Sequence, residues 1–496
     1  MAVRKTATKE PKPAAKSAKA VNANKVHDAI FEAFSEASEH IENELFRSQE
    51  MEDVSGFYPD SLVLSMVYNK VVSGMYVTSG PEQSAKSTIM ATVIGQSLAK
   101  GTMIHKHYDI ERAMSSTYMG NIIAHHSGVD WATLSAKPTK NGKTLHHPRY
   151  RWLLESSLED VFTEITGYLN TLPDKIYISE TQTWRLVFDD YPDTKDGPNV
   201  PKEHKLLHAK IAALCPLDHK LSTKVSKFYD IGDDASFQAF YAIDSIKAMT
   251  LTAVEAGKKG FHQPGLLAKA LSDHIPYVKG YLKRKHAVLW CINQMYTNPM
   301  AKFEDPVYET SGNALKLHSD VRTIAKPTIS VPEPFAKTKG KQGVCTEPSV
   351  LGDGSDTYTF KNLKNIKNKF SPLPYLAGQI RIWSSGPNFV PGIDPVHDTA
   401  SFLVMVGLAQ FGIAKGAPTV KLANHAALEG YAGAIYPWDD FKREVLAECG
   451  IGDAEPSELR QLCWELITSG KAHELIQTNG KSTGSVAVNH LDDDNE

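Results

Sequence analysis

An eight-residue loop, Gly80–Ser87, carries the residue types that phosphate chemistry needs. It lies between an apolar run that ends at Ser79 and a helical pattern that begins near Ile89. Backbone N–H groups of such a loop, and of the helix that follows it, point at phosphate oxygens. Lys86 would supply a point charge to the β- and γ-phosphates, and the Ser87 hydroxyl would be a ligand for Mg²⁺. The sequence therefore predicts a site for ATP and Mg²⁺, formed by Gly80, Pro81, Glu82, Gln83, Ser84, Ala85, Lys86, Ser87 and Thr88.

One position of this loop departs from the usual pattern. The residue before the lysine is ordinarily glycine, and here it is Ala85. If the backbone at this position is helical, alanine costs little. If φ is positive, alanine costs about 1 kcal/mol.

An acidic residue, Asp244, lies where a carboxylate that binds a metal ion would be needed. Asp244 follows the apolar run Phe237–Ile243, and an acid at the end of such a strand can hold Mg²⁺ through its water shell, provided that it lies beside the phosphate loop. The alternative is that Asp244 caps the next helix.

The elements that would position these residues form an alternating series. Apolar runs at Met75–Ser79, Phe237–Ile243 and Ala287–Ile292 are typical of buried parallel strands. Ile89, Met90, Val93, Ile94 and Leu98 recur at helical spacing until Gly101. Strands that alternate with helices predict an α/β fold with a mostly parallel sheet, and ligands then bind at the carboxyl ends of the strands.

Charge is placed unevenly at the two ends of the chain. Residues 1–25 carry seven basic side chains and one acid, and the last six residues carry four acids. A basic arm and an acidic tail predict a polyanionic partner and a segment that competes with it. The alternative is that both ends are solubilising and disordered.

Other classes of protein are disfavoured by composition. Five cysteines are scattered without CxxC spacing, which fits a reducing compartment and argues against a disulfide scaffold or a zinc ribbon. No apolar run approaches 18 residues, and the N-terminus lacks the apolar stretch of a secretory signal. We expect no membrane segment and a cytoplasmic location.

Several strings together resemble the RecA recombinase family, in particular bacterial RecA and the UvsX-like recombinases of bacteriophages. The string Gly312-Asn313-Ala314-Leu315-Lys316 is far more specific than a phosphate loop alone. The resemblance spans about residues 75–370. It implies a RecA-type P-loop ATPase core, and the basic arm and long insertion favour a large-phage version. The other matching strings are Gly80–Ser87, Asp109–Met114 with Tyr118, Ile292–Met295 and Lys367–Lys369.

The resemblance assigns roles in ATP hydrolysis to three residues. Glu111 matches the carboxylate that orients and deprotonates the attacking water, and otherwise it is a helix-surface acid. Tyr118 matches the aromatic residue that stacks on adenine, and otherwise it is a core tyrosine. Gln294 matches the amide that contacts the γ-phosphate and reports it to a DNA-binding loop, and otherwise it caps a strand end.

Two lysines resemble the pair that reaches a neighbouring subunit's ATP. Lys367 and Lys369 are two residues apart on a predicted strand and would point to the same face. The alternative is a solvated basic strand. Leu317 replaces an aromatic residue that the resemblance leads us to expect after the Gly312–Lys316 string.

Two loops that follow the site strands, at about Thr252–Pro264 and Met295–Ser311, resemble the DNA-binding loops of the family. Cations with interleaved aromatic rings suit a single strand, because phosphates pair with lysine and bases stack on rings. Loop composition alone would also fit ordinary surface loops. The expected DNA contacts are Lys258, Lys259, Phe261, Tyr296, Lys302 and Phe303.

The domain prediction combines these patterns. Val26–Leu45 is predicted to be an amphipathic helix, Arg151–Leu169 a helical stretch, and the region from Pro395 to Gln477 mostly helical. The expected parts are a basic disordered arm (1–24), an N-terminal polymerisation helix and linker (25–60), an ATPase core (61–385) with an insertion (121–236), a smaller C-terminal domain (386–478) and an acidic disordered tail (479–496).

The resemblance implies an ATPase of homologous recombination. It would assemble as a helical filament on single-stranded DNA, pair that strand with a homologous duplex and exchange strands, with a mediator or single-strand-binding protein as a possible partner. One alternative is a ring-forming RecA-fold helicase. Another is a structural DNA filament without turnover, which Ala85 keeps open.

Overall fold

The computed structural model describes the greater part of the chain from Gly56 to Gly480. The basic arm, the predicted helix Val26–Leu45 and the acidic tail beyond Gly480 lie outside the described residues. The described ranges are 56–102, 104–112, 115–135, 139–140, 143–144, 150–178, 183–190, 200–202, 204–206, 208–209, 225–230, 237–252, 265–297, 307–309, 312–327, 344–348, 355–373, 375–385, 392–415, 417–428, 430–446 and 458–480.

The chain divides into two compact units. One consists of Met1–Glu52, Tyr177–Thr183 and Asp190–Lys227. The other consists of Asp53–Ile176, Trp184–Asp189 and Phe228–Glu496, and it holds the large sheet with the helices that cover it.

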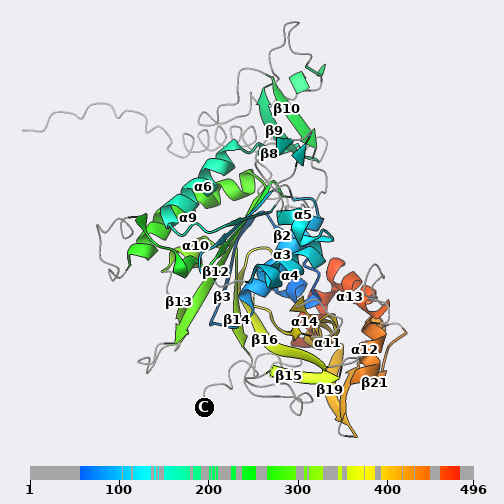
Figure 1. The fold of residues 1–496 in the computed structure, drawn as a ribbon. Coiled ribbons are helices and arrows are strands. Elements are labelled where there is room, and N and C mark those ends of the chain that lie inside the picture. The colour runs from blue at the N-terminus through cyan, green and yellow to red at the C-terminus, as the bar shows by residue number, and fades with distance from the viewer. Residues whose placement is uncertain are drawn as a thin grey trace, which may run out of the picture. The chain divides into compact units, whose positions relative to one another are not determined.

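An eleven-stranded sheet is the centre of this larger unit (Figure 1). Its strand order is β18-β17-β16-β14-β3-β12-β11-β4-β7, with β13 paired to β12 and β15 paired to β16. The strands from β14 to β7 run parallel, and those from β16 to β18 are antiparallel additions at one edge. The predicted α/β class with a mostly parallel sheet is confirmed. The parallel strands are β3 (Gly74–Gly80), β4 (Ile104–Asp109), β7 (Tyr150–Leu153), β11 (Ala239–Asp244), β12 (Ala287–Thr297) and β14 (Val321–Pro327), and the others are β13 (Val307–Glu309), β15 (Val344–Pro348), β16 (Ser355–Asn368), β17 (Ala377–Ser385) and β18 (Gly392–Ile393).

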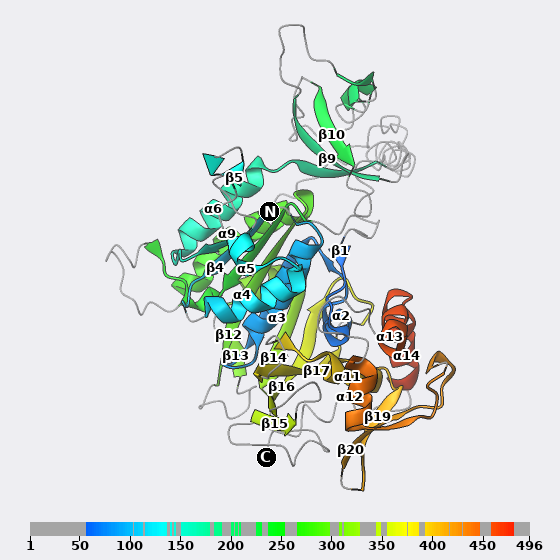
Figure 2. The same ribbon diagram turned by 45° about the vertical axis from the view of Figure 1, so that its right-hand side comes forward.

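Helices cover both faces of the parallel strands, because successive strand residues point to opposite sides. Tyr76 of β3 belongs to one apolar cluster and its neighbours Met75 and Val77 to another. The two turned views place α3 and α4 on one face and α6 and α9 on the other (Figures 1 and 2). These helices are α3 (Lys86–Ala99), α4 (Ser116–Ser127), α5 (Trp131–Ser135), α6 (Leu158–Thr171), α9 (Leu266–Arg284) and α10 (Ala314–His318).

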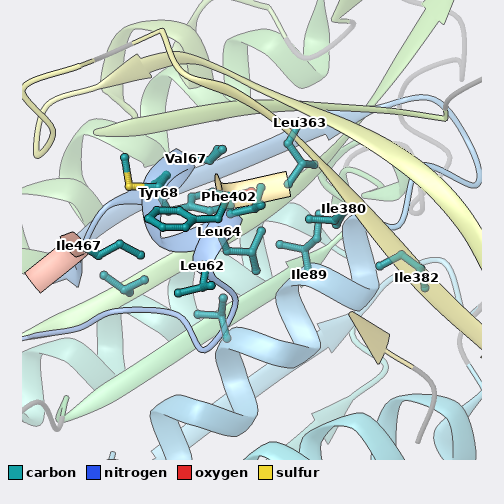
Figure 3. Packing of buried hydrophobic residues seen from close by; sticks show 14 of the residues in the cluster. Leu62, Leu64, Val67, Tyr68, Ile89, Leu363, Ile380, Ile382, Phe402 and Ile467 are labelled. Carbon is teal, nitrogen blue, oxygen red and sulfur yellow. The ribbon is translucent and has the colours of Figure 1, made fainter. Parts of the chain in front are cut away.

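A short, wholly buried helix, α2 (Leu62–Tyr68), packs between the large sheet and the C-terminal helices. Figure 3 shows its side chains among apolar residues from α3, β16, β17 and two C-terminal helices. Those helices are α11 (Pro395–Met405) and α13 (Glu458–Thr468). A helix that is apolar on every side can only be stable when surrounded in this way.

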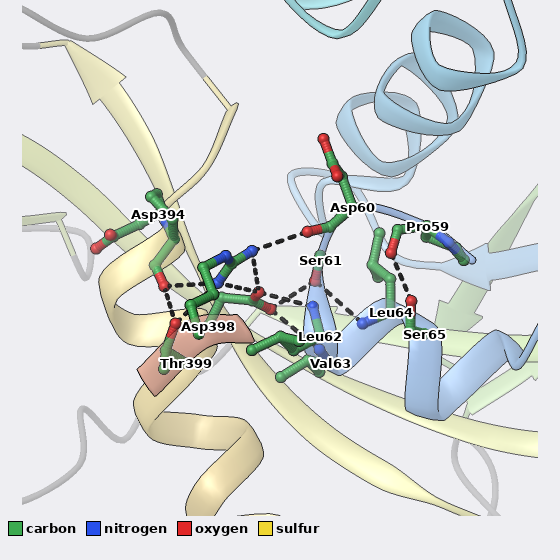
Figure 4. A network of polar contacts seen from close by, with 12 residues as sticks. Pro59, Asp60, Ser61, Leu62, Val63, Leu64, Ser65, Asp394, Asp398 and Thr399 are labelled. Carbon is green, nitrogen blue, oxygen red and sulfur yellow. Dashed lines mark hydrogen bonds and ion pairs between the residues drawn. The ribbon is translucent and has the colours of Figure 1, made fainter. Parts of the chain in front are cut away.

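A buried carboxylate holds the start of α2. Asp398 of α11 accepts hydrogen bonds from the Ser61 hydroxyl and from the backbone N–H groups of Leu62 and Val63, at 2.5, 2.8 and 3.1 Å (Figure 4). Arg460 of α13 reaches the same carboxylate at 3.3 Å. The acid therefore satisfies helix-end donors and is neutralised by one guanidinium.

The local predictions around the phosphate loop hold closely. The strand at Met75–Ser79 is β3, and the following helix ends at Ala99, just before Gly101. The two other predicted strands are β11 and β12, which pair in parallel.

Two helical predictions are right only in part. Tyr150–Leu153 lies in a strand because it pairs with His105–Tyr108, and α6 begins only at Leu158, where the Ser157 hydroxyl caps it. Most described residues between Pro395 and Gln477 are helical, as predicted, but the chain from Ala409 to Pro437 includes an antiparallel sheet that was not predicted, since its strands are defined by their pairing with one another. That sheet consists of β19 (Ala409–Ala414), β20 (Ala417–Leu422) and β21 (Ile435–Pro437), and the remaining helices are α12 (Trp438–Leu446) and α14 (Lys471–Gly480).

The expected insertion, 121–236, contains elements of the core. β7 is the last strand of the central sheet, and α6 packs against α9. Its later part forms a separate three-stranded sheet in the order β10-β9-β8. These strands are β8 (Asp174–Ile178), β9 (Thr183–Asp190) and β10 (Ser226–Asp230).

Candidate nucleotide-binding site

The predicted phosphate loop joins the end of β3 to the start of α3. At Gly80 a side chain has no room, since a Cβ atom there would lie 2.1 Å from the carbonyl oxygen of Ala325. Ser84 is buried, whereas Glu82 and Gln83 are exposed. The first backbone N–H groups of a helix have no acceptors within the helix, so the start of α3 is suited to an anion.

Ala85 has a left-handed backbone, with φ 65° and ψ 21°. Of the two backbone conformations considered for this position, the one with positive φ is present, and it strains the alanine by about 1 kcal/mol. The loop keeps the conformation that glycine would favour.

The Lys86 side chain folds back over its own loop. Its Nζ donates to the carbonyl oxygen of Pro81 at 2.6 Å and to the Ser84 hydroxyl at 3.3 Å. Burial lowers the pKa of Lys86, and the charges of Asp244 and Glu111 act in the opposite direction. A cation held this close to the loop backbone is positioned to meet an anion bound there.

Ser87 and Asp244 come together as the sequence predicts. The Ser87 hydroxyl donates to Asp244 Oδ2 at 2.6 Å, across 157 positions of sequence. Burial raises the pKa of Asp244 to about 7, against the hydrogen bond from Ser87, and the nearby charge of Glu111 raises it further. Asp244 thus lies beside the phosphate loop, which was the condition set for a metal-binding role.

This pair has the chemistry that Mg²⁺ requires. A hydroxyl and a carboxylate oxygen are hard ligands, and Mg²⁺ usually takes one or two protein ligands and completes its octahedron with phosphates and water. Among the described residues, no cluster of three His, Cys, Asp or Glu could hold a metal by itself. Ser87 and Asp244 therefore fit an ion that is shared with a bound phosphate.

Glu111 lies just beyond the end of β4, beside Asp244. Its backbone N–H donates to the Asp244 carbonyl oxygen at 3.3 Å. Gln294 of β12 donates its Nε2 to Glu111 Oε1 at 2.6 Å, and the Ser245 hydroxyl donates to the same oxygen. In the sheet register Gln294 stands opposite Gly80, so the predicted base and the predicted sensor meet at the loop.

Tyr118 of α4 contacts α3, the helix that follows the phosphate loop. Its hydroxyl lies 2.9 Å from the Thr88 hydroxyl, and burial raises the pKa of Tyr118. The predicted adenine-stacking residue is thus tied to α3 next to Lys86 and Ser87.

The two predicted interface lysines contact a different part of the molecule. Lys367 Nζ donates to the carbonyl oxygens of Lys316 and Leu317 at 2.9 Å, at the end of α10. Lys369 Nζ lies 3.2 Å from the nearly buried carboxylate of Asp320. Burial and the neighbouring lysines lower the pKa of Lys367 to about 8. Among the described residues, neither lysine contacts the phosphate loop of its own chain.

Most of the predicted DNA contacts lie outside the described residues. These are Lys258, Lys259, Phe261, Lys302 and Phe303. The backbone of Tyr296 continues β12 and pairs with Tyr308 of β13. Residues 295–297 and 307–309 thus form the two arms of a hairpin directly after Gln294.

One residue of the cluster was missed by the sequence prediction. Ser245 contacts Glu111, and it follows Asp244 directly in the chain, so its position next to the predicted metal-binding acid was the available signal.

The fold and the cluster define an α/β protein with a phosphate-loop-like turn at the carboxyl edge of a mostly parallel sheet. Among the described residues, no helix has the length and apolar character to cross a membrane. No protein-family model matches the chain.

Part of the chain is distantly similar to RecA proteins. It is 29% identical to protein RecA of Teredinibacter turnerae over 166 residues, which are 34% of this chain and 41% of that protein. It is 31% identical to protein RecA of Azoarcus sp. over 130 residues, which are 26% of this chain and 32% of that protein. The chain thus spans less than half the length of these curated relatives.

A solved structure of a RadB recombinase resembles this chain with a TM-score of 0.33 and 11% identity, over 64% of this chain and 93% of that chain. The curated relatives above are bacterial RecA proteins. The expected likeness to phage UvsX-like recombinases stays a prediction.

Proposed function

We propose that this chain is an ATP-dependent recombinase that assembles on single-stranded DNA and exchanges homologous strands. The observation that carries the proposal is the cluster in which Glu111, Gln294 and the pair Ser87–Asp244 meet at the phosphate loop. The distant similarity to RecA proteins supports it.

The residues of the cluster divide the work of hydrolysis. Lys86 and the start of α3 bind the phosphates, and Ser87 with Asp244 would hold Mg²⁺, which neutralises phosphate charge when bound. Glu111 takes a proton from the attacking water, whose oxygen bonds to the γ-phosphorus as the bond to the β-phosphate oxygen breaks. The products are ADP and inorganic phosphate.

ATP acts in this proposal mainly as the ligand that selects the extended filament. Gln294 stands between the loop and the hairpin of β12 and β13, so a contact with the γ-phosphate would reach the segment expected to bind DNA. Lys367 and Lys369 lie away from their own loop and are proposed to meet the ATP of the neighbouring subunit. Hydrolysis then releases DNA.

Electron microscopy with single-stranded DNA, ATP and Mg²⁺ tests the assembly. We expect helical filaments, and closed hexameric rings would favour a helicase instead. Strand exchange between homologous substrates, beside a heterologous control, tests the activity.

A filament without turnover is the second candidate, because the strained Ala85 lies in the loop itself. ATP hydrolysis measured with and without single-stranded DNA separates the two functions. DNA-stimulated turnover supports the recombinase, and filaments that form without any hydrolysis support the inert alternative.

A further inference from the structure

The main chain around Glu111 is fixed on both sides. The backbone N–H groups of Ile110 and Glu111 donate to the Asp244 carbonyl oxygen at 2.8 and 3.3 Å. The next N–H, of Arg112, donates to Asp109 Oδ1 at 3.0 Å. Only rotation about its own side-chain bonds is left to the Glu111 carboxylate.

That rotation is restrained through one oxygen. The Ser245 hydroxyl and Gln294 Nε2 both donate to Glu111 Oε1, the latter at 2.6 Å. No described residue donates to the other oxygen, Oε2. An ionised carboxylate can only accept hydrogen bonds, so two donors on Oε1 define which oxygen faces the reaction.

The two donors differ in rigidity. Ser245 is fully buried, with one side-chain torsion between its backbone and its hydroxyl. Gln294 is longer, partly exposed and expected to exchange contacts with a phosphate. Ser245 is therefore the donor that can hold Glu111 throughout the reaction.

We propose that Ser245 is a positioning residue that holds Oε1 of Glu111, so that Oε2 receives the proton of the attacking water. This inference rests on the proposed hydrolysis of ATP at this site. In the step, the water oxygen bonds to the γ-phosphorus, the bond to the β-phosphate oxygen breaks, and the proton passes to Oε2.

The first test compares Ser245→Ala with the unaltered protein in steady-state ATP hydrolysis, with and without single-stranded DNA. We expect kcat to fall about tenfold, because loss of orientation acts on the transition state. KM and the Kd for a fluorescent ATP analogue should stay within about twofold. Ser245→Thr, which keeps the hydroxyl, should recover most of kcat. If the alanine variant does not fold, Ser245→Cys is used, and its weaker donor should give an intermediate kcat.

Ser97→Ala is the matched control. Ser97 is also fully buried, and its hydroxyl pairs with Thr102 at 2.7 Å toward the other end of α3. It should lose stability without any change in kcat, which separates a general packing defect from an effect on Glu111.

The second test repeats Ser245→Ala in a Glu111→Gln background. Glu111→Gln should lower kcat by about two orders of magnitude or more, and adding Ser245→Ala should then have little further effect. An equal fold-loss in both backgrounds would show a merely structural serine and overturn the inference. A kcat within twofold for Ser245→Ala, beside an inactive Glu111→Gln, would overturn it while leaving the proposed function intact. Full turnover in Glu111→Gln would remove the role of Glu111 itself, and the inference with it.

Discussion

At the scale of single residues, the left-handed backbone of Ala85 leads to a prediction about the stability of the folded protein. Ala85→Gly should raise the free energy of unfolding by about 0.5 kcal/mol, since relief of about 1 kcal/mol of strain exceeds the added entropy of the unfolded chain. Urea unfolding measures the difference. Ala91→Gly, in the interior of α3, should instead lose about 1 kcal/mol, and losses of equal size in both variants would contradict the strain at Ala85.

The raised pKa of Asp244 leads to a prediction about how the stability of the folded protein depends on pH. Its pKa of about 7 lies above the ordinary value of 3.8, so the folded chain holds this proton more tightly than the unfolded chain. Ionisation of Asp244 between about pH 4 and 7 therefore lowers stability. Asp244→Asn cannot ionise, so without Mg²⁺ its Tm should fall less than that of the unaltered protein from pH 5 to pH 8.

Mg²⁺ gives the complementary measurement for Asp244. At pH 8, Mg²⁺ with ATP should raise the Tm of the unaltered protein, because a ligand that binds only the folded state stabilises it. The gain should be smaller in Asp244→Asn. Equal gains in the two proteins would argue that Asp244 does not hold the ion.

At the scale of elements, the contact of β16 with the end of α10 depends on the charge of Lys367. Its pKa of about 8 means that the charge is lost as pH rises through 8. Lys367 is proposed to contact the ATP of the neighbouring subunit, and this contact needs the positive charge. ATP turnover on DNA should therefore decline between pH 7 and 9. Lys367→Arg should flatten the decline, because a guanidinium stays charged. Lys364→Arg, on the same strand, is the control, and a slope unchanged by Lys367→Arg would contradict the role.

The junction of α2, α11 and α13 depends on a buried ion pair. Arg460→Ala leaves the Asp398 carboxylate buried without its cation, so the free energy of unfolding should fall by about 3 to 5 kcal/mol. Arg443→Ala breaks an exposed pair with Asp440 and should cost less than about 0.5 kcal/mol. Similar losses in urea unfolding would mean that Asp398 is not held as described.

The sequence predicts an element well when the residues that determine it are close together in the chain, and poorly when distant segments determine it. The unit of β3, loop and α3 was predictable because its turn chemistry and its periodicity lie within 30 residues. β7 was not, because a strand of four residues is defined by its pairing with β4 rather than by its own pattern. The contact of Ser245 with Glu111 joins positions 134 residues apart, and only the fold reveals it.

At the scale of the whole molecule, the C-terminal helices are part of the core. A chain that ends at Leu446 lacks Arg460 and the apolar residues of α13 that surround α2, so it should not fold cooperatively. A chain that ends at Gly480 retains both and should unfold at the temperature of the full protein. Calorimetry of the two truncations checks this, and a cooperative transition in the shorter chain would contradict it.

The capping of α2 also has a consequence for synthesis on the ribosome. Arg460 donates to the backbone carbonyl of Asp60, 400 positions earlier in the chain. At about 5 to 20 residues per second, about 20 to 80 seconds separate the emergence of α2 from that of its last partners. During that interval the apolar helix lacks the α13 residues that later enclose part of it. The nascent chain should therefore depend on holding chaperones until translation nears its end.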